Sequence, residues 1–148
     1  MERDPHSGPV PPQAWHADAL ARERGRVQIF NATRPDGLDG WTMQVEQYDL
    51  MRAHILEMID EHADPDGTIA LREVVDAAQA RYGNHPLFPR GRTRNYCTYT
   101  KVDLEARCEI ERTGGSPQRI RRAAPRRGAA DPASRHRGTG DENANSPR

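Results

Sequence analysis

The sequence has no long hydrophobic run, because its uninterrupted apolar stretches are only a few residues long. A helix that crosses a bilayer needs about 20 mostly apolar residues. Residues 1–6 also lack the apolar core that a secretion signal requires. We therefore expect a protein that makes no membrane contact and is located in the cytoplasm.

Cysteine is scarce, with Cys97 and Cys108 as the only two. They lie eleven residues apart, on one predicted helix and its end. Because a helix is rigid, this spacing is too long for a disulfide. We expect both to be small buried apolar groups.

Signatures of catalysis are missing as well. The sequence has no glycine-rich phosphate loop, no nucleophile elbow and no carboxylate pair with an evident pocket. His54 and His62 are eight residues apart, which is not the adjacent-turn spacing of a helical metal pair. Cys97 would need an exposed, electropositive setting to act as a nucleophile. These absences predict a protein that is not an enzyme and has no cofactor and no metal.

One segment has the approximate spacing of a calcium loop. Within residues 62–73, the positions that match an EF-hand loop are Asp64, Asp66, Gly67, Ile69 and Glu73. The first ligand position is His62, a poor ligand for a hard cation, and no second loop is present to pair with this one. An ordinary turn is the favoured interpretation, and cation binding here is left open.

Both ends of the chain are poor in large apolar side chains. Residues 1–25 contain four prolines, and residues 123–148 consist largely of Ala, Arg, Gly, Pro and Ser. Such segments bury too little surface to offset the entropy lost on ordering. We predict disordered tails at residues 1–25 and 123–148, the second one basic, around a single domain at residues 26–122.

Periodicity within this domain predicts a helix, a short strand, two further helices and a hairpin. The helices are expected at residues 43–62, 71–82 and 93–107, and the short strand at 68–70. Strands at 109–113 and 118–122 form the hairpin, with Ile110 and Ile120 facing inward. A short strand or arm at 27–30 precedes them. Leu87 and Phe88 are expected to fill the core from a proline-bounded loop.

This element order is that of a winged helix. The predicted fold class is α+β, mainly α: a winged helix-turn-helix of three helices and a C-terminal β-hairpin wing. For the helix at 93–107, we expect an inward side and an outward side. The inward side holds Tyr96, Tyr99, Val102 and Ala106, and the outward side holds Arg94, Thr98, Lys101 and Glu105.

Three motifs resemble a family of small bacterial proteins of unknown function. They are Tyr48-x-x-Met51-Arg52-x-x-Ile55-Leu56, then Leu87-Phe88-Pro89-x-Gly91, and Thr100–Arg107 followed by Ile110 and Arg112. The resemblance covers residues 26–122 and implies a winged-helix-like core without implying an activity. At Cys108 the family pattern has glycine, which suits a left-handed residue just past a helix end.

Basic side chains gather around the start of the helix at 93–107 and in the hairpin. In helix-turn-helix proteins the N-terminal residues of the second helix contact base edges in the major groove, and flanking arginines contact phosphates. We therefore predict a DNA-binding accessory or transcription-regulatory protein acting on duplex DNA. The predicted contact residues are Arg90, Arg92, Arg94, Asn95, Thr98, Lys101, Arg119, Arg121 and Arg122.

Two other interpretations are left open. In one, hairpin arginines pair with Glu109 and Glu111 across the strands, and the helix face is merely solvated. In the other, the domain binds a protein partner through the acidic outer faces of its first two helices. A homodimer, with Trp41 and nearby tyrosines at its interface, is a related possibility.

Overall fold

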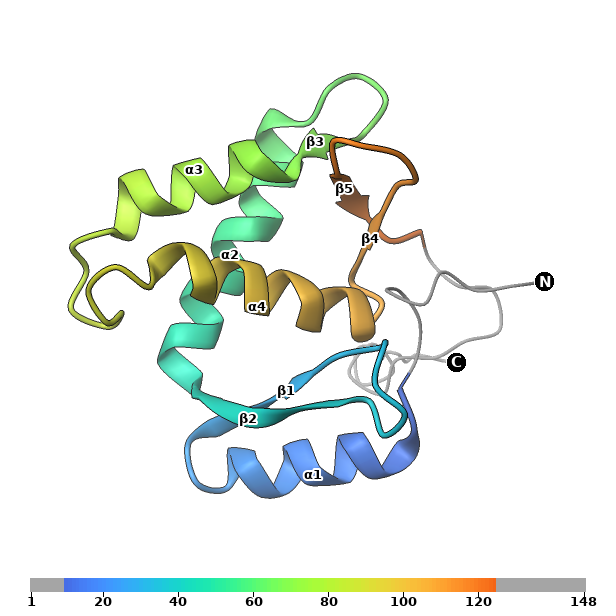
Figure 1. Cartoon of the computed structure of the whole chain (residues 1–148), viewed down its shortest axis with the longest axis vertical. Helices are drawn as coiled ribbons and strands as arrows, with labels where there is room; N and C mark the ends of the chain where they lie inside the picture. The colour runs from blue at the N-terminus through green and yellow to red at the C-terminus, as the bar shows by residue number, and fades with distance from the viewer. Residues whose placement is uncertain (1–9, 125–148) are drawn as a thin grey trace, which may run out of the picture.

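The structure is a computed structural model that describes residues 10–124. Within them it has an α+β fold with four helices and two small antiparallel sheets (Figure 1). The parts of the predicted tails at residues 1–9 and 125–148 lie outside the described residues.

The segment Pro12–Arg22 forms helix α1, so the predicted tail over residues 1–25 is wrong in this part. Proline-rich composition suggested disorder, but Pro12 is the first residue of the helix, where no amide hydrogen bond is lost. The helix buries Ala14, Asp18 and Ala21. It packs against strand β1 (Arg26–Phe30), so the N-terminal segment is part of the domain.

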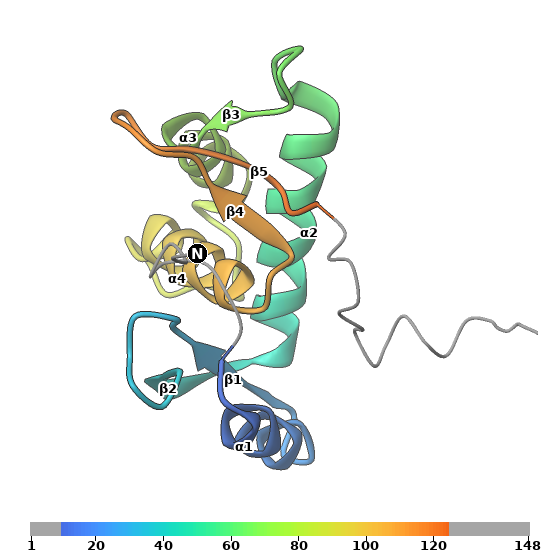
Figure 2. The same ribbon diagram turned by 90° about the vertical axis from the view of Figure 1, so that its right-hand side faces the viewer.

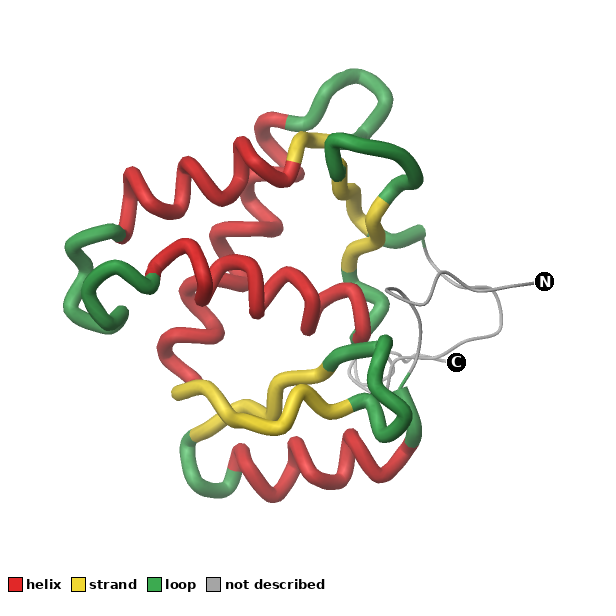
Figure 3. Tube along the Cα trace, viewed as in Figure 1, coloured by secondary structure: helices red, strands yellow, loops and turns green. Residues whose placement is uncertain are grey.

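Strand β1 pairs with strand β2 (Leu38–Gln44), which the sequence analysis did not predict. The helix predicted at residues 43–62 included the last two residues of this strand. The connection is ordered because the Asn31 amide donates to the Gly37 carbonyl at 2.8 Å. Gly37 has a φ of 78°, and a Cβ there would lie only 2.7 Å from the Cβ of Val10. The loop thus closes tightly enough to bring a second strand beside β1 (Figure 3).

The remaining elements agree closely with the prediction. They are α2 (Val45–His62), β3 (Ile69–Ala70), α3 (Leu71–Tyr82), α4 (Thr93–Ala106), β4 (Ile110–Arg112) and β5 (Arg119–Arg122). Strand β5 lies between β3 and β4 in a three-stranded antiparallel sheet. Ile110 and Ile120 are fully buried and Phe88 is 5% exposed, which confirms their predicted core positions.

Helix α4 lies in the middle of the molecule, between the two sheets and against α2 and α3 (Figures 1 and 2). On one side, β1 contacts α4 and in turn carries α1 on its other side. On the other side, β4 follows α4 directly and packs back on it. The main apolar core is therefore built on α4, α2 and α3, with Met51, Ile55, Val74, Cys97 and Leu104 at or near zero exposure.

A buried ionic network joins α1, β1, α2 and the C-terminal end of α4. The Arg107 guanidinium donates to Asp103 at 2.8 Å and to Asp18 at 3.1 Å. Asp103 also accepts hydrogen bonds from the Tyr48 hydroxyl at 2.6 Å and from the Phe30 amide at 2.8 Å. The guanidinium lies over the Phe30 ring, 4.0 Å from its centroid. Each of these four elements contributes at least one hydrogen-bonding partner to the network.

Burial sets the electrostatic cost of this network. It raises the pKa of the Asp103 carboxyl, although Arg107 and the two other donors favour the ionised form. Burial acts on Asp18 in the same direction, but Arg107, the Gln28 amide and Arg22 together outweigh it, and the pKa of Asp18 is lowered. Asp18 is thereby ionised at neutral pH and holds α1 to the end of α4.

We expect the substitution Arg107→Leu to destabilise the fold by about 3–5 kcal/mol, because it leaves the buried Asp103 carboxylate without its cation and Asp18 with only the partly exposed Arg22. The matched control is Arg122→Leu, which removes the half-exposed pair with Asp60 and should cost only about 0–1 kcal/mol. Urea denaturation followed by circular dichroism measures both. An equal loss of unfolding free energy in the two variants would show that the buried network does not hold α1 and β1 against α4.

His54 on α2 is buried and hydrogen-bonded at both ring nitrogens. Its Nδ1 lies 3.3 Å from an Arg81 nitrogen that can only donate. The proton is therefore on Nε2, which donates to the Val74 carbonyl at 2.9 Å. Burial lowers the pKa of His54, and the nearby Arg81 charge also lowers it, so the folded protein holds the ring neutral.

This neutral histidine predicts a loss of stability in acid. Because the folded-state pKa lies below the unfolded value of about 6.5, the stabilisation is complete above that pH and is lost as the pH falls toward the folded pKa. Comparing pH 7.5 with pH 5.5, wild-type protein should lose about 1 kcal/mol more than His54→Gln. His62→Gln, at an exposed histidine of the same helix, should behave like wild type. A parallel pH dependence in wild type and His54→Gln would exclude this role.

Candidate nucleic-acid interface

The outward side of α4 is a stripe of four uncharged side chains. Asn95 is exposed, and Thr98, Tyr99 and Val102 are partly exposed. Spacings of three and four place them together along one side of the helix. Their exposure places this stripe at the surface of the domain, although α4 itself packs against α2 and α3 on its other sides.

This orientation corrects the predicted one. Tyr99 and Val102 were expected inside, yet they reach the surface, while the side chains of Lys101 and Glu105 are only 4% and 1% exposed. The prediction ranked side chains by polarity, and that ranking fails when a charged pair is buried together. The two hairpins also cover α4 on both flanks near its C-terminal end, so buried positions there are not confined to one stripe.

Lys101, the only lysine in the sequence, is not available to a phosphate. Its Nζ donates to Glu105 at 3.2 Å and to Gln118 at 2.6 Å, which ties α4 to the residue before β5. Burial lowers the pKa of Lys101, and Glu105 opposes this shift. The predicted nucleic-acid contact at Lys101 is wrong because its side chain is buried and bonds Glu105 and Gln118.

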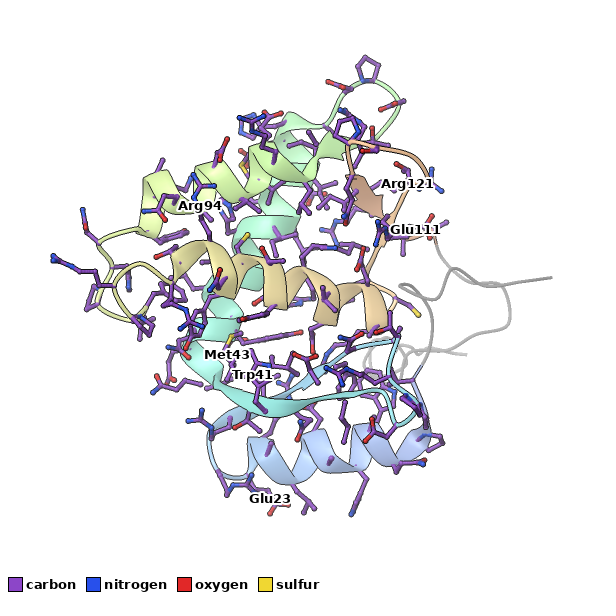
Figure 4. The ribbon with its side chains drawn as sticks, in the orientation of Figure 1. Glu23, Trp41, Met43, Arg94, Glu111 and Arg121 are labelled. Atoms are coloured by element: carbon purple, nitrogen blue, oxygen red, sulfur yellow. The ribbon has the colours of Figure 1, made fainter. Side chains whose placement is uncertain are left out.

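The start of α4 carries the exposed basic groups. Arg90 lies in the loop before the helix and Arg92 at its N-cap position, and both are exposed. Within residues 10–124 neither side chain has a hydrogen-bonding or ion-pair partner. Arg94 pairs with Asp76 of α3 at 2.7 Å, and both of these side chains are about half exposed (Figure 4).

All three predicted arginines of the hairpin have acidic partners. Arg121 bonds Glu111 on the neighbouring strand at 2.7 Å, and the two side chains meet beside the hairpin in Figure 4. Arg122 bonds Asp60 of α2 at 2.8 Å, and Arg119 bonds Asp64 in the loop before β3. Cross-strand pairing, one of the alternatives left open by the sequence, is confirmed for Arg121.

In the segment at residues 62–73 that resembles a calcium loop, Asp64 and Asp66 accept hydrogen bonds from other residues of the protein. Asp64 accepts from Arg119, and Asp66 accepts from both the amide and the hydroxyl of Thr68 at 2.9 Å. Across the described part of the chain, no three His, Cys, Asp or Glu side chains are grouped so that they could hold a metal ion. These contacts are those of an ordinary turn before a short strand.

The two cysteines have different surroundings. Cys97 is buried as predicted, and burial raises the pKa of its thiol to about 12. Cys108 is half-buried, so the prediction of a buried group is wrong there. Its φ of 66° is the left-handed conformation that the family pattern accommodates with glycine. Neither cysteine forms a disulfide within residues 10–124.

Trp41 on β2 flanks the outward stripe, a role that the sequence analysis did not assign. Its ring meets Tyr99 edge-on at 5.1 Å and Tyr96 at 6.1 Å, and its indole nitrogen donates to Asp39 at 2.8 Å. Figure 4 places Trp41 between β2 and α4. The position of Trp41 beside α4 depends on strand β2, and the sequence of this strand has no alternating apolar pattern from which to predict it.

Comparison with known proteins places the chain in a family. A family model described as a family of unknown function (DUF6958) matches residues 26–120, which span β1 to β5. No curated protein and no solved structure matches the chain. No helix among residues 10–124 has the length and apolar character needed to cross a membrane. Because the match covers most of the chain, including the stripe on α4 and its basic start, the protein belongs to the DUF6958 family.

Proposed function

We propose that residues 26–122 form a winged helix that binds duplex DNA through the N-terminal half of α4, as a non-enzymatic accessory or regulatory protein. The element order from α2 to β5 supports the winged-helix assignment, and so does the sheet order β3-β5-β4, in which the last strand lies between the other two. In this assignment α4 is the recognition helix, and the β4–β5 hairpin is the wing beside it.

The observation that carries the proposal is the free basic pair at the start of α4. Arg90 and Arg92 are exposed and unpaired within residues 10–124, and Asn95 and Thr98 follow on the outward side of the helix. A recognition helix places these positions nearest the groove, with the preceding loop against the DNA backbone. Arg90 and Arg92 would therefore meet the DNA backbone, and Asn95 and Thr98 would meet the base edges in the groove.

Electrostatics predict that this binding is modest. Residues 10–124 hold 16 basic and 17 acidic side chains, so the domain as a whole does not attract a polyanion. The wing arginines are already balanced by Asp60, Asp64 and Glu111. The phosphate contacts proposed for the described residues are accordingly Arg90 and Arg92, with Arg94 joining them if it leaves Asp76.

A second candidate function is docking of a basic protein segment on α2. The outer side of this helix presents Glu46, Asp49 and Glu61, which are exposed and have no ion-pair partner within residues 10–124. Substitutions on α2 leave Arg90, Arg92 and the stripe of α4 unchanged, so the two functions are tested separately when both kinds of binding are measured for each variant. Loss of partner binding in Glu46→Gln/Asp49→Asn, with DNA binding intact, would support this candidate.

The DNA-binding proposal is tested by the salt dependence of binding to a random-sequence duplex, measured by fluorescence anisotropy with the full chain. Each phosphate contact adds about 0.9 to the slope of log affinity against log salt concentration. Arg90→Ala/Arg92→Ala should therefore lower the magnitude of the slope by about 1.8 and weaken binding at low salt.

Arg121→Ala is the matched control, because it removes one exposed arginine that already has a carboxylate partner. It should leave the slope close to that of wild type. The proposal is wrong if wild-type protein does not bind duplex at low salt, or if the double variant and wild type show the same slope.

A further inference from the structure

The lack of charge on the outward stripe of α4 bears on which base pairs a recognition helix can read. Its members Asn95, Thr98, Tyr99 and Val102 carry no charge. Of the two cations closest to it in sequence, Lys101 is buried against Glu105, and Arg94 lies in the first turn of the helix in an exposed pair with Asp76. Guanine is read most often by arginine or lysine. The stripe therefore offers no cation that is free to read guanine beyond the first turn of the helix.

Asn95 supplies the polar contact that the stripe can make. Its side chain is exposed in the first turn of α4 and has no partner within residues 10–124. An asparagine amide can bond adenine through N6 and N7 at the same time. Because its amide is not engaged by a neighbour, Asn95 is free to take this geometry.

The next turns offer methyl groups. The Thr98 hydroxyl donates back to the Arg94 carbonyl at 3.0 Å, so its methyl group is the part left for an outside contact. Val102 is partly exposed and packs against neither hydrophobic cluster of the domain. Tyr99 is fixed beside them by its edge contact with Trp41. Threonine and small apolar side chains contact the methyl group of thymine in the major groove.

We propose that this stripe reads A·T base pairs in the major groove, with Asn95 bonding adenine and with Thr98 and Val102 contacting thymine methyl groups. The inference rests on the proposed DNA binding through α4 and adds the class of sequence that it selects. Arg90 and Arg92 then hold the DNA backbone without regard to sequence, while the stripe supplies the preference.

Three duplexes of equal length test the inference with the full chain: an A·T-rich duplex, its G·C-rich counterpart, and the A·T-rich duplex with uracil in place of thymine. Wild-type protein should prefer the A·T-rich duplex over the G·C-rich one by about tenfold, within the range of one bidentate base contact. Uracil keeps the hydrogen-bonding groups and removes only the methyl, so it should weaken binding several-fold.

Two substitutions assign the effects to residues. Asn95→Ala should lower the A·T preference to the several-fold part that the methyl contacts supply, and Val102→Ser should reduce the penalty caused by uracil. Both positions are at least partly exposed, and urea denaturation checks that each variant folds. Arg121→Ala is the control and should keep both the preference and the uracil penalty.

The outcomes separate this inference from the proposed function. If no duplex binds at low salt, the proposed function is wrong and the base preference with it. If all three duplexes bind equally well, DNA binding stands and the reading of A·T pairs is wrong. If Val102→Ser weakens binding to every duplex by the same factor, the stripe makes a general contact and the inference is overturned.

Discussion

The placement of α4 depends on one buried cation, the Arg107 guanidinium just after the end of the helix. It bonds Asp103 on the helix itself and Asp18 on α1, and it stacks on Phe30 of β1. Burying charges is costly unless each one has partners, and here the partners come from three elements. The N-terminal helix and hairpin are therefore held to α4 by this network. Removing Arg107 or Asp103 would leave a buried charge with fewer partners.

This constraint explains which part of α4 is exposed. Arg107 brings β1 and α1 against the C-terminal end of the helix, and Lys101 brings in the residue before β5 through Gln118. The side chains from Asp103 to Ala106 are consequently all buried. The first turns escape this cover, so Asn95 and the preceding arginines reach solvent. The two internal ion pairs thus determine the surface that is left for a macromolecule.

Local signals in the sequence were enough to predict most elements. Turn residues at Asp64–Gly67 and apolar spacings of three and four located α2, α3 and α4 to within a few residues, and Ile110 and Ile120 located the two strands of the hairpin. Helix α1 was missed because its stabilising contacts are distant in sequence, such as that of Asp18 with Arg107. Strand β2 was missed because Gly40 and Asp39 interrupt its apolar pattern.

The candidate site was predicted only in part, for a related reason. Whether an arginine is free depends on acids far along the chain. Asp60 and Asp64 neutralise Arg122 and Arg119 across 62 and 55 residues, and no local pattern reveals this. Arg121 is the exception, because its partner Glu111 lies opposite it in the hairpin. Basic residues counted from sequence therefore overstate the positive surface of this domain.

Pairing and burial do not remove a basic residue from function to the same degree. An exposed pair such as Arg94 with Asp76 is worth about 0–1 kcal/mol, so a phosphate can replace the carboxylate at little cost. Lys101 differs, because freeing its ammonium would separate α4 from Gln118 and leave Glu105 buried without that cation. Burial therefore excludes Lys101, whereas an exposed pair such as Arg94 with Asp76 or Arg121 with Glu111 only competes with a ligand. The exposed basic groups of α4 and its preceding loop that break no ion pair on binding are Arg90 and Arg92, next to the uncharged stripe of α4.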